Sequence, residues 1–219
     1  MNVLQTDHSA LSTRHSALKK AVFVDKDGTL IEDVPYSCDV ARIRLLPGAG
    51  EGLRRLEGAG FHVIVVSNQA GVAHGYFEER ALWSVAAALE GLLASEGVTL
   101  KGFYYCPHHP EGMVAAYAVE CLCRKPGPGL LQRAANEWGV SLAESWMIGD
   151  ILHDVEAGHR AGCCTVLIDN GHETEWRLGG RRWPDHVARD LKEAARLIVG
   201  CDEWEASDAV EVRPAYESV

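Results

Sequence analysis

The sequence predicts an α/β fold in which a parallel sheet is flanked by helices. Short, nearly continuous apolar runs alternate with longer segments of helical periodicity, which is the pattern of strands joined by crossover helices. Polar clusters directly follow several apolar runs, as functional residues do at the carboxyl ends of parallel strands. With 219 residues, the chain is long enough for one domain with a developed core.

The strands are expected to be short and apolar, because strands buried on both faces carry few polar residues. In chain order they fall at residues 21–24, 62–67, 102–105, 146–148 and 165–168. Apolar residues at steps of three and four predict a long helix over residues 77–95. Shorter helices are expected at 130–138, 154–161 and 191–198.

The two ends of the chain lack this pattern. Residues 1–18 mix polar side chains without periodicity, and residues 201–219 are acidic and equally patternless. We therefore expect one domain over residues 19–200 between two flexible tails.

Composition and charge restrict the partners. The formal net charge of -10 disfavours nucleic acid, whose phosphates are bound by clustered Lys and Arg. No export signal or apolar run of membrane-spanning length is visible. Seven cysteines, three of them between positions 106 and 123, fit a reducing compartment and a metal site better than a disulfide framework. We therefore expect a cytoplasmic monomer without membrane or nucleic-acid partners.

The first expected strand leads into two carboxylates two residues apart, Asp25 and Asp27, followed by Gly28. Both carboxylates can face one cavity if the chain turns after Asp25, and Gly28 permits such a turn. Like charges this close favour a divalent cation of the Mg²⁺ type, which prefers oxygen ligands. The alternatives are an Asx-rich turn or a calcium loop, and the calcium loop lacks its bidentate Glu.

Two further strands also end in polar residues. The second ends at Ser67, Asn68 and Gln69, whose hydroxyl and amides can hold phosphate oxygens, although such residues also occur in ordinary turns. The fourth leads to Asp150, which supplies another acidic metal ligand unless it only caps a helix. Between them, Lys125 stands before a proline and can neutralise a transferring phosphoryl group.

Taken in order, these four signals resemble the four motifs of the haloacid dehalogenase (HAD) superfamily. The resemblance implies a Rossmann-like HAD fold without a large cap domain. It also implies that Asp25 attacks phosphorus to form an aspartyl-phosphate and that Asp27 acts as general acid and base. By the same resemblance, Ser67 and Lys125 hold the phosphoryl group. The implied Mg²⁺ ligands are Asp25, the backbone carbonyl of Asp27, and Asp150, with Asp154 in an indirect or structural role.

A second metal site is expected in the loop before Lys125. Three thiolates and an imidazole match a closed tetrahedral Zn²⁺ site, formed by Cys106, His108, Cys121 and Cys123. The neighbouring His109 is an alternative ligand. With no open coordination position, this metal is expected to be structural and to fasten the loop that carries Arg124 and Lys125.

The strings at residues 67–75, 104–110 and 121–126 closely resemble the bacterial D-glycero-D-manno-heptose 1,7-bisphosphate phosphatases. The resemblance implies that a small phosphorylated sugar loses its C7 phosphate. This chain has His74 where the family usually has Arg, and Ser67 where it often has Thr. The implied substrate contacts are Asp33, Val34, Pro35, Tyr36, Ser67, Asn68, Gln69, Ala70, Arg124 and Lys125.

Two alternative functions fit less well. Histidinol-phosphate phosphatases share the motifs and a similar zinc loop, but their usual Asp-Gly-Leu-Gly-Thr does not match residues 70–74. A silent, zinc-stapled binding module would not need the complete catalytic set. Among other reactive side chains, Cys163 and Cys164 are expected to be buried, and His159 shows no partners in the sequence.

Overall fold

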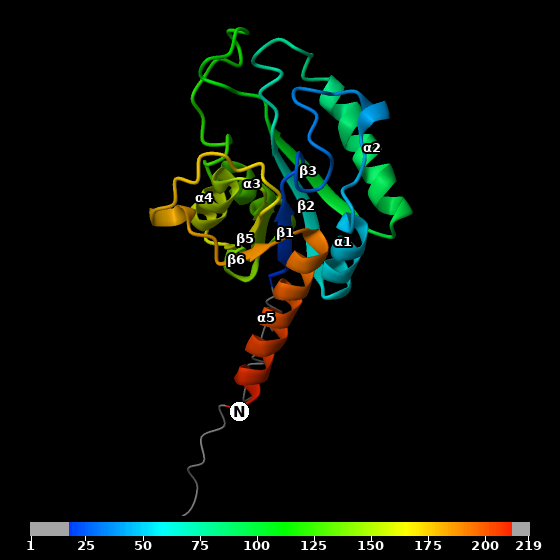
Figure 1. The fold of residues 1–219 in the computed structure, drawn as a ribbon, viewed down its shortest axis with the longest axis vertical. Coiled ribbons are helices and arrows are strands. Elements are labelled where there is room, and N and C mark those ends of the chain that lie inside the picture. Colours follow the sequence, from blue (N-terminus) through cyan, green and yellow to red (C-terminus); the bar gives the residue numbers. More distant parts are fainter. Residues whose placement is uncertain (1–17, 212–219) are drawn as a thin grey trace, which may run out of the picture.

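The computed structural model describes residues 18–211, with the backbone alone for residues 202–211. Its centre is a parallel sheet of six strands in the order β3-β2-β1-β4-β5-β6 (Figure 1). The strands are β1 (Lys20–Val24), β2 (Phe61–Asn68), β3 (Leu100–Cys106), β4 (Trp146–Gly149), β5 (Cys164–Ile168) and β6 (His186–Ala188).

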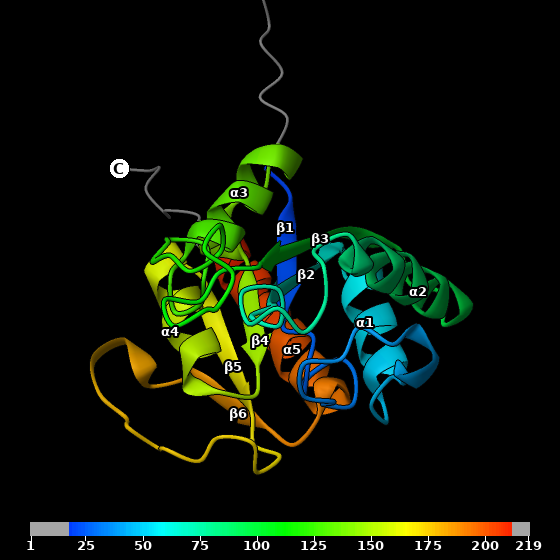
Figure 2. The same cartoon turned by 90° about the horizontal axis from the view of Figure 1, so that it is seen from above.

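Five α-helices cover the two faces of this sheet, as seen from above in Figure 2. They are α1 (Ala49–Gly58), α2 (Ala81–Ser95), α3 (Gly129–Trp138), α4 (Leu152–Ala161) and α5 (Leu191–Glu211). Side chains of α1, α2 and α5 share one apolar cluster with one face of the sheet, and those of α3 and α4 share a second cluster with the other face.

Strand β1 shows why the strands are apolar throughout. Val22 and Val24 enter the cluster under α1, α2 and α5, whereas Ala21 and Phe23 enter the cluster under α3 and α4. Successive side chains of a strand point to opposite faces, and here both faces are covered. The predicted α/β class with a parallel sheet is therefore confirmed.

The expected elements are present with shifted ends. The five predicted strands each differ by one or two residues at an end, α2 begins at Ala81 instead of residue 77, and α4 begins at Leu152 instead of residue 154. The sequence did not predict β6, which has three residues, or α1.

Helix α1 escaped prediction because glycine disfavours helices, and this helix contains three glycines. The structure gives the reason for one of them. A Cβ at Gly52 would lie 2.5 Å from the carbonyl oxygen of Leu191, so the glycine permits close approach to α5. Leu53 and Leu56 add buried apolar surface to the same cluster.

Helix α5 continues to Glu211, past the domain boundary that we placed after residue 200. The predicted tail is thus helical over residues 201–211, while residues 1–17 and 212–219 lie outside the described part of the chain. Within residues 18–211, no helix is long and apolar enough to cross a bilayer. The segment between β1 and α1 contains loops and a 3-10 turn at Val40–Arg42, and the segment between β2 and α2 is a loop, so neither holds a large cap domain.

Candidate active site

The polar ends of the central strands meet at one edge of the sheet. Strand β1 pairs in parallel with both β2 and β4, and Asp25 and Asp150 each follow directly after their strand. The Asp25 amide donates to the carbonyl oxygen of Ile148 at 2.9 Å, which extends the ladder to Asp25. Ser67 is the second-last residue of the neighbouring strand β2. The convergence expected from the sequence is therefore present.

Three buried carboxylates form a compact group at this edge. Asp25, Asp150 and Asp154 each offer an oxygen, and these oxygens lie within 4.8 Å of one another. The ammonium of Lys125 contacts Asp25, lies 2.7 Å from Asp154 Oδ1 and donates to the carbonyl oxygen of Val66 at 3.1 Å. When all four groups are ionised, the carboxylates outnumber the ammonium by two, which matches a divalent cation with oxygen ligands.

The ionisation of these groups reflects their burial. Burial raises the pKa of Asp25 well above its usual range, against the opposing effect of Lys125. Burial and the neighbouring Asp154 raise the pKa of Asp150 to about 6. Burial works to lower the pKa of Lys125, but Asp154 and Asp25 together raise it above its ordinary value. Lys125 therefore remains cationic, and further positive charge would favour the ionised forms of Asp25 and Asp150.

Asp27 lies in a different environment from Asp25. Its side chain is 30% exposed and outside the three-carboxylate group. One oxygen contacts the Lys26 ammonium, and the other accepts from Gln69 Nε2 at 3.0 Å. The Asp25 carboxylate is thus buried, whereas the Asp27 carboxylate faces the adjacent cavity. Two carboxylates in such different environments can act one as a nucleophile and the other as an acid and base.

The residues at the end of β2 contact Asp27 and Lys125. Gln69 Nε2 also donates to Ser67 Oγ at 2.8 Å, which leaves the hydroxyl hydrogen of Ser67 free to donate elsewhere. The amide of Asn68 donates to the Lys125 carbonyl and accepts from the Lys125 amide, both at 3.0 Å. Asn68, which we expected at the substrate, therefore uses its side chain to position Lys125.

A cavity of about 390 Å³ opens beside Asp27. Most of the expected substrate contacts line it, namely Asp33, Val34, Pro35, Tyr36, Asn68, Gln69, Ala70 and Arg124. The remaining two, Ser67 and Lys125, are buried at the strand ends. The structure thus brings the expected substrate segments together around one space.

His74 lies in an aromatic group at the Tyr36 side of this cavity. The centroid of its ring is 5.7 Å from that of Tyr36, 5.8 Å from that of Tyr76 and 4.8 Å from that of His109. These rings come from three separate segments of the chain. At the position where the resembling family usually has Arg, this chain therefore has a ring that packs between loops.

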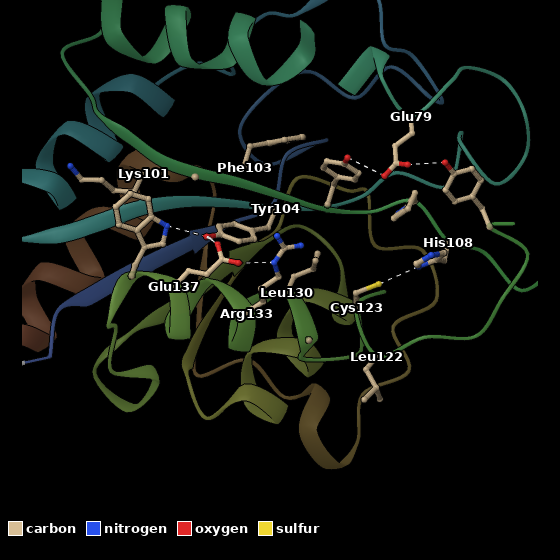
Figure 3. Close-up of a pocket in the computed structure, with 16 residues that line it drawn as sticks. Glu79, Lys101, Phe103, Tyr104, His108, Leu122, Cys123, Leu130, Arg133 and Glu137 are labelled. Carbon is tan, nitrogen blue, oxygen red and sulfur yellow. Dashed lines mark hydrogen bonds and ion pairs between the residues drawn. The ribbon is translucent and has the colours of Figure 1, made fainter. Parts of the chain in front are cut away.

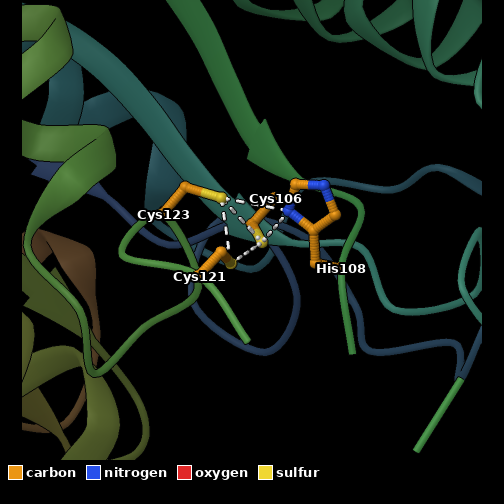
Figure 4. Close-up of side chains that lie close together, drawn as sticks. All are labelled: Cys106, His108, Cys121 and Cys123. Carbon is orange, nitrogen blue, oxygen red and sulfur yellow. Dashed lines mark hydrogen bonds between the residues drawn. The ribbon is translucent and has the colours of Figure 1, made fainter. Parts of the chain in front are cut away.

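The four expected zinc ligands converge in the loop before Lys125, as Figure 4 shows. Cys123 Sγ lies 3.1 Å from Cys106 Sγ, 3.2 Å from Cys121 Sγ and 3.3 Å from His108 Nδ1. The alternative ligand His109 instead accepts from the Glu111 amide at 3.2 Å. The cluster can hold a metal ion, and it is His108 that faces the thiols.

A larger cavity, of about 960 Å³, runs along the free edge of β3 (Figure 3). Aromatic side chains line much of it, and Glu79 accepts hydrogen bonds there from the hydroxyls of Tyr105 and Tyr117. None of the three clustered carboxylates lines this cavity. They do not line the smaller cavity either, but Asp27 and eight of the expected substrate contacts line the smaller cavity and not this one, so the candidate site is placed there.

The sequence missed two partners of Asp150. Thr29 Oγ1 donates to Asp150 Oδ1 at 3.3 Å, and His172 Nδ1 lies 2.6 Å from Asp150 Oδ2. Thr29 belongs to the first motif, so its position was a usable signal. His172 lies in a loop without any motif, and only the folded chain brings it to the site.

Two expectations about other side chains were wrong. His159 has partners, because its Nε2 lies 2.9 Å from Asp185 Oδ2 and 3.1 Å from Thr165 Oγ1. Cys164 is exposed, whereas Cys163 is buried as expected. A residue at the end of an apolar strand can face either way, and the sequence does not show which.

Comparison with known proteins agrees with this geometry. The HAD-hydrolase-like family model matches residues 122–194. A D-glycero-beta-D-manno-heptose-1,7-bisphosphate 7-phosphatase of Pasteurella multocida (strain Pm70) is 37% identical over 185 residues, which cover 84% of this chain and 98% of that protein.

Two solved structures share the fold. A putative HAD-like phosphatase from Mesorhizobium loti has a TM-score of 0.74 and 33% identity, over 85% of this chain and 87% of that one. A D,D-heptose 1,7-bisphosphate phosphatase from B. bronchiseptica, complexed with magnesium and phosphate, has a TM-score of 0.67 and 27% identity, over 83% and 98%.

The fold and the strand-end carboxylates define the site of a HAD-like phosphatase. The identity of 37% over 98% of the Pasteurella multocida protein identifies one family within this class. The chain belongs to the D-glycero-beta-D-manno-heptose-1,7-bisphosphate 7-phosphatase family.

Proposed function

We propose that this chain hydrolyses the C7 phosphate of D-glycero-D-manno-heptose 1,7-bisphosphate and leaves the 1-phosphate. The observation that carries the proposal is the buried pair of Asp25 and Lys125, next to a cavity lined by Asp27 and Arg124. The names of the relatives support this choice of substrate.

In the first step, a carboxylate oxygen of Asp25 attacks phosphorus and the bond from phosphorus to the C7 oxygen breaks. The electron pair stays on that oxygen, which takes a proton from Asp27. An aspartyl-phosphate remains on Asp25. Lys125 is held beside Asp25 by three contacts and is placed to offset the charge on the phosphoryl oxygens, and Ser67 can donate its free hydroxyl hydrogen to them.

In the second step, Asp27 is ionised and takes a proton from a water molecule whose oxygen attacks phosphorus. The bond from phosphorus to Asp25 breaks, and inorganic phosphate leaves with Asp25 restored. Gln69 holds the Asp27 carboxylate in place for both steps. The partial exposure of Asp27 toward the cavity fits a group that must meet substrate and water in turn.

The cluster of Asp25, Asp150 and Asp154 fits Mg²⁺, because its buried carboxylate oxygens carry an excess of negative charge. Asp25, Asp150 and the backbone carbonyl of Asp27 are the residues that would hold it. When bound, Mg²⁺ neutralises negative charge on the carboxylates and on the phosphoryl group. Asp154 acts through its ion pair with Lys125.

At the second cluster we infer Zn²⁺, since three thiols and one imidazole are soft ligands in the number that a structural zinc site requires. Arg124 and Lys125 follow Cys123 directly, and Arg124 Nη1 lies 3.3 Å from the carbonyl oxygen of His108. The bound metal would fasten the loop that supplies both cations to the active site.

The decisive test compares phosphate release from the heptose bisphosphate, histidinol phosphate and an aryl phosphate, with and without Mg²⁺. We expect the highest kcat/KM for the bisphosphate, no turnover without Mg²⁺, and the heptose 1-phosphate as the product by phosphorus NMR. Higher kcat/KM for histidinol phosphate, or release of the C1 phosphate, would contradict the proposal.

The cysteines support a cytoplasmic location for this activity. All seven are free thiols, and three of them converge on the metal-capable cluster instead of forming disulfides. Such thiols persist in a reducing compartment. Locating a tagged chain in cell fractions tests this placement.

A further inference from the structure

The segment that follows β5 is tied to both acidic segments of the active site. Asn170 Nδ2 donates to the carbonyl oxygen of Gly28, in the turn after the nucleophile, at 2.6 Å. Glu173 Oε2 accepts at 2.7 Å from the amide of Leu152, the first residue of the helix that carries Asp154. Two anchors therefore hold this segment against the turn after β1 and the start of α4.

Between these anchors, His172 reaches a carboxylate of the site. Its Nδ1 lies 2.6 Å from Oδ2 of Asp150, whose side chain is 5% exposed. Thr29 Oγ1 occupies one position on the other oxygen, Oδ1, at 3.3 Å. A carboxylate oxygen accepts two hydrogen bonds or ligands, so both oxygens keep a free lone pair for a cation.

The packing around this contact leaves little freedom. A Cβ at Gly28 would lie 2.1 Å from Asp150 Oδ2 and 2.4 Å from His172 Nδ1. The His172 side chain is 43% exposed. The backbone amide of His172 donates to Asn170 Oδ1 at 3.2 Å. This hydrogen bond holds the backbone of His172, so the half-exposed ring stays in contact with Asp150.

We propose that His172 is a positioning residue that holds the Asp150 carboxylate in its cation-binding orientation and thereby sets the affinity for Mg²⁺. The inference rests on the proposed function, because it takes Asp150 as a Mg²⁺ ligand. Hydrogen-bond partners of metal ligands orient them, and their loss typically costs about 10- to 100-fold in metal affinity or activity. His172 does not line the substrate cavity, and it reaches the site through Asp150.

The test is the Mg²⁺ dissociation constant, measured by titration calorimetry on the full chain without substrate. His172→Ala should raise it by about 10- to 100-fold. His172→Asn places an amide N–H near the position of Nδ1 and should restore most of the affinity. The matched control is Arg177→Ala in the same loop, which should leave the dissociation constant unchanged because Arg177 is 78% exposed and pairs with the exposed Glu175.

A second measurement separates positioning from general stability. A merely structural role would lower the melting temperature of the metal-free protein and leave Mg²⁺ affinity unchanged. His172→Phe keeps a ring of similar size without the hydrogen bond, and should lose affinity as His172→Ala does. A dissociation constant within twofold of wild type in either variant would overturn the proposal. Failure of the proposed function would look different, since wild-type protein would bind Mg²⁺ yet not hydrolyse the bisphosphate.

Discussion

At the scale of single residues, the site depends on one ammonium placed among buried carboxylates. Lys125 contacts Asp25 and Asp154, and Asn68 fixes its backbone through two hydrogen bonds. A buried charge is stable only when it is paired and hydrogen-bonded, and Lys125 satisfies both conditions. The same contacts define where a phosphoryl group can be neutralised.

Replacing the nucleophile tests this arrangement. Asp25→Asn should abolish turnover, because an amide of nearly unchanged shape is a poor nucleophile. Since burial already opposes the ionisation of Asp25, removing its charge should not lower the melting temperature of the metal-free protein. Phosphate release and thermal unfolding on the same preparation check both outcomes. Near wild-type turnover would show that another group attacks phosphorus.

Replacing Lys125 and replacing Arg124 should have different effects on turnover. Lys125→Ala should depress turnover on every phosphomonoester, because Lys125 lies beside the nucleophile. Arg124 lines the cavity, where its planar fork can hold the distant part of the substrate. Arg124→Ala should therefore reduce kcat/KM for the heptose bisphosphate by about ten- to a hundredfold more than for an aryl phosphate. An unchanged ratio between the two substrates would mean that Arg124 does not recognise the sugar.

At the scale of elements, two segments have little local tendency to adopt their conformation. Close packing stabilises one of them, and a cluster of potential metal ligands stabilises the other. Helix α1 has three glycines yet packs closely against α5. The loop between Cys106 and Cys123 has no helix or strand, and these two cysteines converge with Cys121 and His108. In both cases, contacts between residues far apart in sequence hold the local conformation.

Two glycines of α1 make a matched pair for testing the packing. Gly52→Ala should destabilise the protein by about 1–3 kcal/mol, because the added Cβ would meet the Leu191 carbonyl oxygen. Gly58→Ala has nothing within 4 Å of the added atom and should stabilise by up to about 1 kcal/mol. Urea unfolding of both variants measures the difference. Equal effects would show that contact with α5 does not explain the glycine at position 52.

Removing one thiol tests the metal loop. Cys121→Ser should lower zinc content and melting temperature together, because a structural metal contributes directly to folding free energy. Elemental analysis of protein purified without a metal-binding tag provides the zinc content, and Cys38→Ser is the control outside the cluster. Full stability in zinc-free wild type would contradict a structural role for the metal.

At the scale of the whole molecule, the parallel sheet gathers acidic residues that repel one another, and a bound cation relieves this repulsion. The pKa of Asp150 is raised to about 6, against an unfolded value of about 3.9. A carboxyl with a raised pKa contributes stability below about pH 3.9 and loses it as the pH rises through about 6. The metal-free protein should therefore lose stability over this range.

Mg²⁺ should reverse this trend. At a concentration of 100 times its dissociation constant, it should stabilise the protein by about 2.7 kcal/mol near pH 7.5, and less as the pH falls below about 6. Unfolding curves with and without Mg²⁺ at several pH values measure the difference. Asp150→Asn should weaken the pH trend, to which Asp25 also contributes, and remove most of the Mg²⁺ effect. A Mg²⁺ effect that does not change between pH 5 and pH 7.5 would contradict the assignment.

Some features were determined by the sequence alone, because they depend on local composition and order. Apolar runs predicted five strands, polar residues at strand ends pointed to Asp25, Ser67 and Asp150, and the resemblance to the HAD motifs added Lys125 to the same site. Parallel strands must bring their carboxyl ends to one edge, so the convergence followed from topology. Ligand type and number likewise indicated the metal-capable cluster.

Other features were decided only by the tertiary structure. The choice of His108 over His109, the engagement of Asn68 with Lys125, and the approach of His172 to Asp150 each depend on segments far apart in sequence. Helix α1 likewise forms where propensity opposes it, and its Gly52 lets it pack closely against α5. These are contacts between distant segments, whose energies appear only once the chain has folded, so no local pattern could have shown them.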